Sequence, residues 1–160
     1  MLAAVGPEEV RARRFIAMKT TRRTLTAGSL VLNLEVDAAG LLHAVNLPEK
    51  VPADLDTASL AQALAELGQY QLAMEGPPFH RLVWERMLAI PWGSALTYGE
   101  LAAAVGSAKA NQAVGQACAR NRLPLVVPCH RVLAQAGMGG FAYGPDWKAR
   151  LLELECEPQP

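Results

Sequence analysis

The chain is 160 residues long, 51% hydrophobic and 19% charged, with a formal net charge of zero. This composition excludes an intrinsically disordered chain, and the length suffices for one ordinary domain or for a small domain packed on another. Residues 1–75 hold 7 Lys/Arg against 9 Asp/Glu and residues 76–160 hold 8 against 6, a difference too small to indicate a nucleic-acid surface by itself.

The N-terminal residues 1–75 predict a small sheet and one helix. We expect the first dozen residues to be loosely held. Residues 24–48 predict two strands around a turn at 37–40, because leucine and valine recur on both sides of the sequence Asp-Ala-Ala-Gly. In residues 56–73 leucines return at helical spacing with polar residues between them, which is typical of an amphipathic helix.

The segment 74–79 is the expected domain boundary. Its Pro77 and Pro78 end one helix and open the next. The helix that follows carries apolar residues along one face and is predicted to end before residues 91–94. We therefore expect a second domain over 76–160.

The second domain is predicted to be mostly helical. Residues 97–100 read as a capping box, in which threonine and glutamate satisfy the first backbone N–H groups of a short helix. That helix is expected to end at Gly106, and Ser107 is expected to cap a second helix over 108–120. Two short helices joined by a tight turn are a helix-turn-helix candidate, although many helical pairs share this pattern.

The second of these two helices is unusually slim. One interpretation, favoured by base rates, is close packing against neighbouring helices. The other is insertion into a narrow groove. The residues that leave little beyond the backbone cylinder are Ala110, Ala113, Val114, Gly115 and Ala117. A Gly-rich loop at 136–146 and a last helix over 147–155 are predicted to follow.

Cys129 is the strongest candidate for chemistry. It ends a β-branched, proline-bracketed run that predicts a strand, and His130 stands beside it. A thiol becomes a nucleophile when a histidine takes its proton. Neighbours in an extended segment point to opposite sides, so the pair needs a turn or a bridging water, and Glu153 or Glu155 is needed to orient the imidazole. A nucleophile, a metal ligand and a buried thiol all remain open at this point.

The remaining cysteines and histidines argue against metal and against disulfides. Zinc sites use four ligands, often in CxxC pairs, and no second ligand lies at such spacing from Cys129, while His43 and His80 are isolated. We expect no metal and no cofactor, and we read Cys118 and Cys156 as small buried hydrophobic residues. The odd cysteine count and the lack of a signal peptide or an apolar run of roughly 18 residues predict a soluble, cytoplasmic protein.

The sequence VPCHRV at 127–132 carries a resemblance. With ARNRLPLV before it and GFAYG, a lysine and LLELE after it, this motif resembles the O6-alkylguanine-DNA alkyltransferase family, the methylated-DNA–protein-cysteine methyltransferases. The stretch PFHRLVWERMLAIPWGSALTYGELAAAVG is also similar to that family, so the resemblance runs from about Pro77 to Glu155. It implies an α+β fold, with a ribonuclease-H-like N-terminal domain packed on a mostly helical C-terminal domain that contains a helix-turn-helix.

The resemblance also implies a function. An O6-alkylguanine would be flipped out of duplex DNA bound through its minor groove, and its alkyl group would pass irreversibly to Cys129, once per protein molecule. Such an enzyme would be monomeric, without cofactor, and associated with the nucleoid when bound to DNA. The alternative is a non-catalytic sensor of alkylated DNA, although the alkyltransferase-like sensors have replaced the nucleophile that this chain retains. A transcriptional regulator is a third possibility, but the helix over 108–120 is too small and neutral for base readout.

Individual roles follow from the same resemblance. His130 would accept the thiol proton through a water, Glu155 would hold the imidazole, and Asn121 would brace the loop. The implied catalytic residues are Cys129, His130, Glu155 and Asn121. The residues implied around the extruded base are Tyr98, Pro124, Val132, Ala142 and Tyr143. The residues implied to contact DNA are Thr97, Tyr98, Ala110, Gln112, Ala113, Gly115, Arg120 and Arg131.

Two positions depart from the pattern of the family. The family places an arginine just before Ala-Val-Gly in the recognition helix, where this chain has Gln112. Glutamine lacks the charge and the stacking plane, so we expect weaker DNA binding or slower flipping. Tyr143 stands where many members have glycine, and its ring is expected to narrow the pocket in favour of methyl over benzyl. Because no cysteine precedes Cys118, the N-terminal zinc of some members is expected to be absent.

Overall fold

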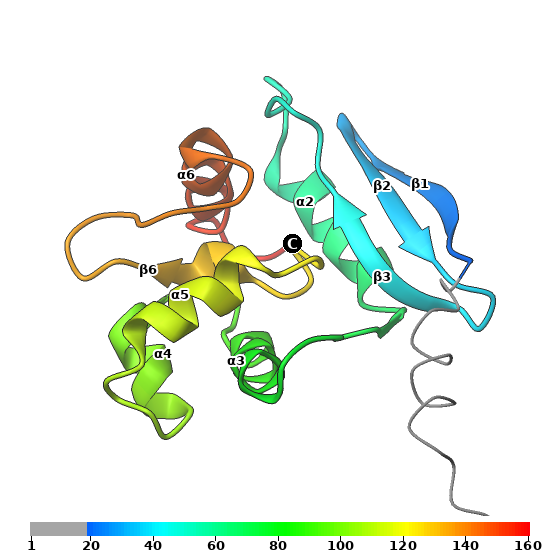
Figure 1. Ribbon diagram of the computed structural model, residues 1–160. Helices are drawn as coiled ribbons and strands as arrows, with labels where there is room; N and C mark the ends of the chain where they lie inside the picture. The colour runs from blue at the N-terminus through cyan, green and yellow to red at the C-terminus, as the bar shows by residue number, and fades with distance from the viewer. Residues whose placement is uncertain (1–18) are drawn as a thin grey trace, which may run out of the picture.

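A computed structural model describes residues 19–160, and the expectation for the first dozen residues lies outside them. Within this range helix α2 covers one side of a small sheet, and a group of helices, α3 to α6, lies on that same side, beyond α2 (Figure 1). Buried side chains from both parts join in one hydrophobic core. The predicted mixture of helices and a small sheet is confirmed.

The sheet contains four strands in the order β1-β2-β3-β4. They are β1 (Thr21–Ala27), β2 (Leu30–Val36), β3 (Leu41–Asn46) and β4 (Gln71–Leu72). The first three are antiparallel, and β4 pairs in parallel with β3. Because side chains alternate along a strand, β2 buries every second residue against the core.

Helix α2 (Thr57–Leu67) lies between β3 and β4 in the chain and packs on β1 and β2. Its N-cap is Asp56, whose Oδ1 accepts the backbone N–H of Ser59 at 2.8 Å. The predicted helix over 56–73 was therefore too long, since the chain leaves the helix at Gly68 and its last residues form β4.

The helical part contains four α-helices, one 3-10 helix and two very short paired strands. These elements are α3 (Pro78–Leu88), β5 (Leu96–Thr97), α4 (Tyr98–Ala104), α5 (Asn111–Ala119), the 3-10 helix η1 (Cys129–Arg131), β6 (Val132–Leu133) and α6 (Pro145–Leu154). The proline start of α3 and the capping box of α4 are confirmed. Strands β5 and β6 pair in parallel and place the start of α4 beside η1.

Two local predictions in this part are wrong. Ser107 does not cap α5, because the backbone N–H of Ala110 closes a turn onto the Ser107 carbonyl at 2.8 Å and the helix begins only at Asn111. The run before Cys129 is a series of turns and not a strand. Leu125 has a φ of 71° there, a left-handed conformation that a leucine adopts only where its surroundings impose it.

Helix α6 ties the helical part to the sheet part. The Trp147 indole donates to the Pro48 carbonyl at 3.0 Å, and the Arg150 guanidinium donates to the Leu55 carbonyl at 2.6 Å. These two hydrogen bonds hold the segment that connects β3 to α2 against α6. Within residues 19–160, no helix is long and apolar enough to cross a membrane.

Candidate active site

Cys129 opens η1 directly after Pro128 and lies in the wall of a cavity. The cavity has a volume of about 240 Å³, and the cysteine is 6% exposed. Neighbouring side chains point to opposite sides only in an extended strand. Because this segment is a 3-10 helix, Cys129 and His130 are not forced to point apart. The cavity is lined by Tyr98, Gly115, Cys118, Ala119, Cys129, Gly140, Phe141 and Ala142.

A groove adjoins this cavity and shares Tyr98 and Gly115 with it. Its volume is about 680 Å³. The groove runs between the start of α4 and the start of α5, so two helix ends and the chain after β6 form its walls. Its lining residues are Thr97, Tyr98, Gly99, Glu100, Asn111, Gln112, Gly115, Ala134 and Gln135.

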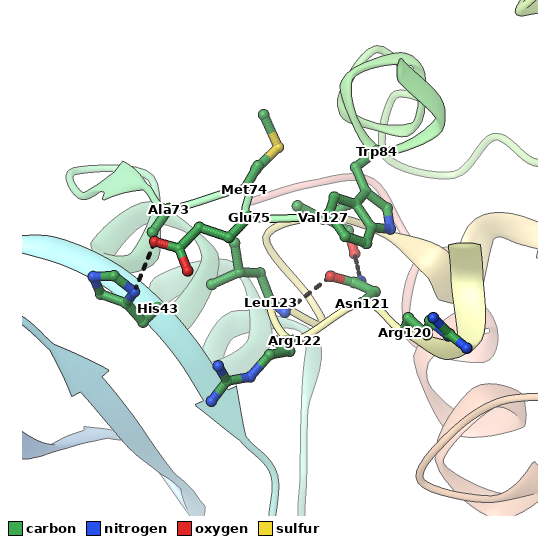
Figure 2. A pocket seen from close by; sticks show the side chains of 10 residues that line it. All are labelled: His43, Ala73, Met74, Glu75, Trp84, Arg120, Asn121, Arg122, Leu123 and Val127. Carbon is green, nitrogen blue, oxygen red and sulfur yellow. Dashed lines mark hydrogen bonds and ion pairs between the residues drawn. The ribbon is translucent and has the colours of Figure 1, made fainter. Parts of the chain in front are cut away.

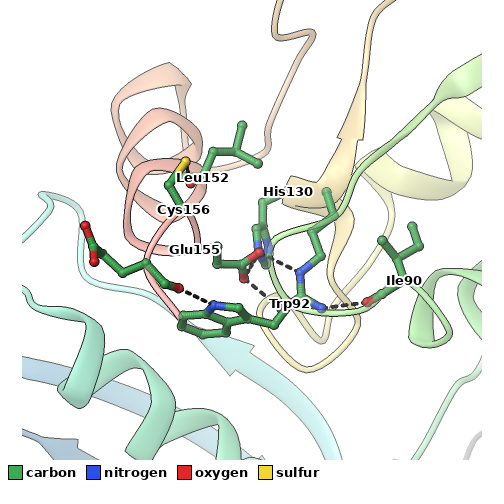
Figure 3. A network of polar contacts seen from close by, with 8 residues as sticks. Ile90, Trp92, His130, Leu152, Glu155 and Cys156 are labelled. Carbon is green, nitrogen blue, oxygen red and sulfur yellow. Dashed lines mark hydrogen bonds and ion pairs between the residues drawn. The ribbon is translucent and has the colours of Figure 1, made fainter. Parts of the chain in front are cut away.

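Behind Cys129, a buried carboxylate joins η1 to the end of α6. Glu155 Oε1 lies 2.7 Å from His130 Nε2, and the Arg131 guanidinium donates to both oxygens of Glu155 at 2.7 and 2.8 Å (Figure 3). Arg131 also donates to the Ile90 carbonyl at 2.7 Å. The prediction that Arg131 contacts DNA is wrong, because its charge is buried in this bidentate pair. Of the two glutamates considered for His130, Glu155 fills the role and Glu153 pairs with Arg150.

The charges of this network set the protonation of His130. Burial raises the pKa of Glu155, but hydrogen bonds from His130 and Arg131 outweigh it and hold the pKa at about 2. Burial lowers the pKa of His130, against the opposing effect of Glu155, so the imidazole is neutral at pH 7. Since Nε2 faces an ionised carboxylate, we assign the proton to Nε2. Among residues 19–160 the buried Nδ1 has no hydrogen-bond partner, and it keeps its lone pair.

The Cys129 thiol is protonated at rest. Burial raises its pKa, while the Asn121 amide, the charge of Lys148 and neighbouring backbone N–H groups oppose the increase. A thiol in this state is a weak nucleophile until a base takes its proton. His130, with an available ring nitrogen, is the base that the fold supplies next to it.

Asn121 holds the turns that lead to Cys129. Its Nδ2 donates to the Val127 carbonyl at 2.8 Å, and its Oδ1 accepts the Leu123 N–H at 2.9 Å (Figure 2). A cavity of about 80 Å³ lies behind these turns, against β3. Arg120 and Arg122 line this cavity and not the groove beside Tyr98, so the structure does not bring Arg120 to the expected DNA contact.

Two residues at the site were not predicted. Lys148 is fully buried, and its Nζ donates to the carbonyls of Val132 at 2.5 Å and Gly140 at 3.0 Å. Cys118 faces the same cavity as Cys129. The available signal for Lys148 was its spacing, because it stands seven residues before Glu155 and therefore on the same face of the last helix.

Three of the residues expected around the base do not line the cavity. They are Pro124, Val132 and Tyr143. Tyr143 instead donates its hydroxyl to the Val45 carbonyl in β3 at 3.2 Å, so the expected narrowing of the pocket by its ring is not found. The carbonyl of Val132 accepts a hydrogen bond from the Lys148 ammonium. Ala142 does line the cavity.

One face of the slim helix α5 packs against neighbouring helices, and another face borders the groove. Val114, Ala117 and Cys118 are buried against neighbouring helices. A Cβ atom added at Gly115 would meet nothing within 4 Å in the described part of the chain, so packing against residues 19–160 does not require glycine there. Ala110 is the N-cap of α5, and neither it nor Ala113 lines the groove.

The comparisons with known proteins agree on one family. The family described as "6-O-methylguanine DNA methyltransferase, DNA binding domain" matches residues 78–157. A methylated-DNA–protein-cysteine methyltransferase of Mycobacterium leprae is 34% identical over 139 residues, which cover 80% of this chain and 81% of the relative. A probable enzyme of the same name from Acanthamoeba polyphaga mimivirus is 44% identical over 84 residues, which cover 52% of this chain and 56% of that relative.

Solved structures extend the likeness over both parts of the fold. The crystal structure of Mycobacterium tuberculosis OGT in complex with DNA is 30% identical, covers 84% of this chain and 92% of its own, and gives a TM-score of 0.68. Among residues 19–160, no three potential metal-ligating side chains gather at one place. With its PCHR sequence in η1 and its match over residues 78–157, the chain belongs to the 6-O-methylguanine DNA methyltransferase family.

Proposed function

We propose that this chain repairs DNA by transferring the alkyl group of O6-alkylguanine irreversibly to Cys129, once per molecule. The observation that carries the proposal is the Cys129 thiol in a cavity wall, next to a histidine that a buried carboxylate orients. A soft thiolate suits attack on a saturated carbon and needs no metal or cofactor.

The reaction needs one bond made and one broken. The Cys129 sulfur bonds to the alkyl carbon, the bond from that carbon to guanine O6 breaks, and the electron pair stays on the base, which regains its carbonyl. The thiol proton passes toward His130 Nδ1 through a water, and the guanine takes up one proton, so no co-reactant is consumed. The product is a stable thioether, which limits each molecule to a single turnover.

The groove beside the cavity is the proposed DNA contact. A base in a duplex must leave the stack before a side chain can reach it, at a cost of a few kcal/mol. Tyr98 and Gly115 belong to both the groove and the cavity, so a nucleotide rotated out of DNA in the groove could enter the cavity. The open space at Gly115 supports close approach of α5 to the minor groove.

We also propose a division into domains, a helix-turn-helix and a ribonuclease-H-like scaffold. We divide the chain into a scaffold domain over 1–75 and a DNA-binding domain over 76–160, which acts as a monomer. Contacts between α4 and α5 support a helix-turn-helix. Three antiparallel strands followed by α2 and a parallel β4 support a ribonuclease-H-like scaffold. Association with the nucleoid would follow from DNA binding.

The decisive measurement is the intact mass after exposure to duplex DNA that contains O6-methylguanine. We expect the mass to rise by about 14 Da, one methyl group in place of a proton, and the change to map to the peptide that contains Cys129. Cys129→Ser should show no such rise, whereas Cys156→Ser should react like the wild type. An unchanged wild-type mass with DNA still bound would favour the non-catalytic sensor.

Gln112 lies exposed in the groove, at the second residue of α5. Its replacement by arginine adds a charge and a stacking plane at the point where the extruded base leaves a gap. We expect Gln112→Arg to increase the transfer rate from duplex DNA more than the rate from the free O6-alkylated base. Single-turnover rates with both substrates provide the measurement, and equal increases would exclude a role in extrusion.

A further inference from the structure

Glu155, the residue that holds His130, lies at the very end of a helix. Helix α6 ends at Leu154, and Glu155 is its C-cap. Helix ends fray unless other contacts hold them. The hydrogen bonds from His130 and Arg131 reach only the carboxylate, and both donors belong to η1. The backbone at Glu155 therefore needs a separate support.

The turn at 91–94 provides this support and contacts the end of α6 at two points. Trp92 donates its indole N–H to the Glu157 carbonyl at 2.8 Å (Figure 3). Gly93 has a φ of 76°, a left-handed conformation that favours glycine. A Cβ atom added at Gly93 would lie 3.0 Å from the Glu155 carbonyl oxygen, so a larger residue there must push on the Glu155 backbone.

The residue before this turn holds η1. The Ile90 carbonyl accepts a hydrogen bond from the Arg131 guanidinium at 2.7 Å. Residues 90–93 thus contact η1 at one point and the end of α6 at two. His130 belongs to the first of these elements and Glu155 to the end of the second. One short segment therefore sets the separation between the imidazole and the carboxylate.

We propose that Trp92 and Gly93 are positioning residues that keep Glu155 at the distance at which it holds His130. This inference rests on the proposed alkyl transfer, in which His130 Nδ1 accepts the thiol proton. With Glu155 Oε1 at 2.7 Å from Nε2, the ring proton stays on Nε2 and Nδ1 keeps its lone pair. If the end of α6 moves away, the imidazole can carry its proton on Nδ1 or rotate, and neither state accepts the thiol proton.

Gly93→Ala tests the close approach to Glu155. The added Cβ pushes on the Glu155 carbonyl, and the left-handed backbone adds strain. We expect single-turnover methyl transfer from duplex DNA to slow about tenfold. Gly40→Ala is the matched control, because Gly40 has a φ of 85° but an added Cβ would meet nothing within 4 Å among residues 19–160. Its transfer rate should equal that of the wild type.

Trp92→Phe tests the other contact, because it keeps an aromatic ring and removes the indole N–H. We expect transfer to slow about two- to fivefold, the effect of losing one exposed hydrogen bond. An unchanged rate in both Trp92→Phe and Gly93→Ala would overturn the proposal.

A double variant separates positioning of His130 from a general loss of structure. In a His130→Gln background, Gly93→Ala should slow transfer no further, because the reaction no longer uses the imidazole. A tenfold loss in that background as well would mean that Gly93 supports the fold and not the base, and the positioning role would be wrong.

Nitrogen NMR of the imidazole rings gives a second readout, in the free protein and without transfer. In the wild type, His130 should show a protonated Nε2 and an unprotonated Nδ1. In Trp92→Phe and Gly93→Ala these two signals should move toward each other, whereas those of His43 and His80 should stay in place. Unchanged His130 signals would overturn the positioning role and leave alkyl transfer intact. If the signals shift as expected but the wild type transfers no methyl group, the proposed function fails and the hold on the imidazole remains.

Discussion

Glu155→Gln should lower the free energy of unfolding by about 3 kcal/mol, the usual consequence of removing one partner from a buried ion pair. The substitution keeps the size of the side chain but removes the negative charge between His130 and Arg131. Arg131 is then left charged and buried with only neutral acceptors among residues 19–160, the Ile90 carbonyl and the new amide oxygen. Urea denaturation at pH 7 measures the change.

Glu153→Gln is the control two residues away on the same helix. Glu153 pairs with Arg150 at 2.8 Å, but its side chain is 69% exposed, and such surface pairs contribute little, so we expect a change within about 0.5 kcal/mol. In the double variant Arg131→Met/Glu155→Gln, the loss should be smaller than the sum of the single losses, because no unpaired charge stays buried. Additive losses would contradict the ion-pair explanation.

The pH dependence provides a second check on Glu155. Its folded pKa, about 2, lies below the ordinary value of 4.5. The stabilisation from its ionised form is therefore fully present above pH 4.5 and is lost as the pH falls from 4.5 toward 2. The stability gap between wild type and Glu155→Gln should narrow over that window and stay constant above it.

His130→Gln should slow alkyl transfer by about 10²- to 10⁴-fold, the usual contribution of a general base. Glutamine can still hydrogen-bond Glu155, but it cannot accept the thiol proton. The variant must react through the small fraction of Cys129 that ionises unaided, and burial raises the pKa of that thiol above its ordinary value of 9.0. Its rate should therefore rise about tenfold per pH unit through neutral pH, because the thiolate fraction does.

The wild type should show a much flatter profile over the same range. Burial lowers the pKa of His130 below 6.5, so the imidazole stays neutral and able to act as a base from pH 6.5 upward. Single-turnover rates from pH 6.5 to 8.5 provide the measurement. His80→Gln is the control, because His80 is also buried with an unpartnered Nδ1 but lies on α3 outside the cavity. A wild-type rate and profile in His130→Gln would remove His130 from the reaction.

Signals that are complete within a few residues predicted the structure well. The capping box at 97–100 and the prolines before α3 specify helix starts by local hydrogen bonding and backbone geometry alone. Strand β1 was missed because its first four residues are exposed and mostly polar, so they lack the alternation that marks a half-buried strand. The leucine and valine run before Cys129 has the composition of a strand, yet local hydrogen bonds of the Asn121 side chain to Leu123 and Val127 hold it in turns.

In the active site, too, residues marked by a local motif were predicted, and residues whose role depends on distant partners were not. The PCHR sequence located Cys129 and His130, and the resemblance supplied Glu155, which contacts His130 in the structure. The roles of Arg131 and Lys148 depend on partners distant in sequence. A basic residue is a surface residue by default, and only a carboxylate 24 residues away explains the burial of Arg131. Lys148 is buried by two carbonyls that no sequence pattern identifies.

The raised pKa of Cys129 has a consequence for the protein before it meets DNA. Under the proposed transfer Cys129 reacts once, so it must survive all earlier encounters with soluble electrophiles and oxidants, and these attack thiolates much faster than thiols. At 6% exposure and in its protonated form, Cys129 offers such reagents little, while the exposed Cys156 is open to them. The burial that makes Cys129 depend on His130 as a general base thus also protects the thiol from these reagents.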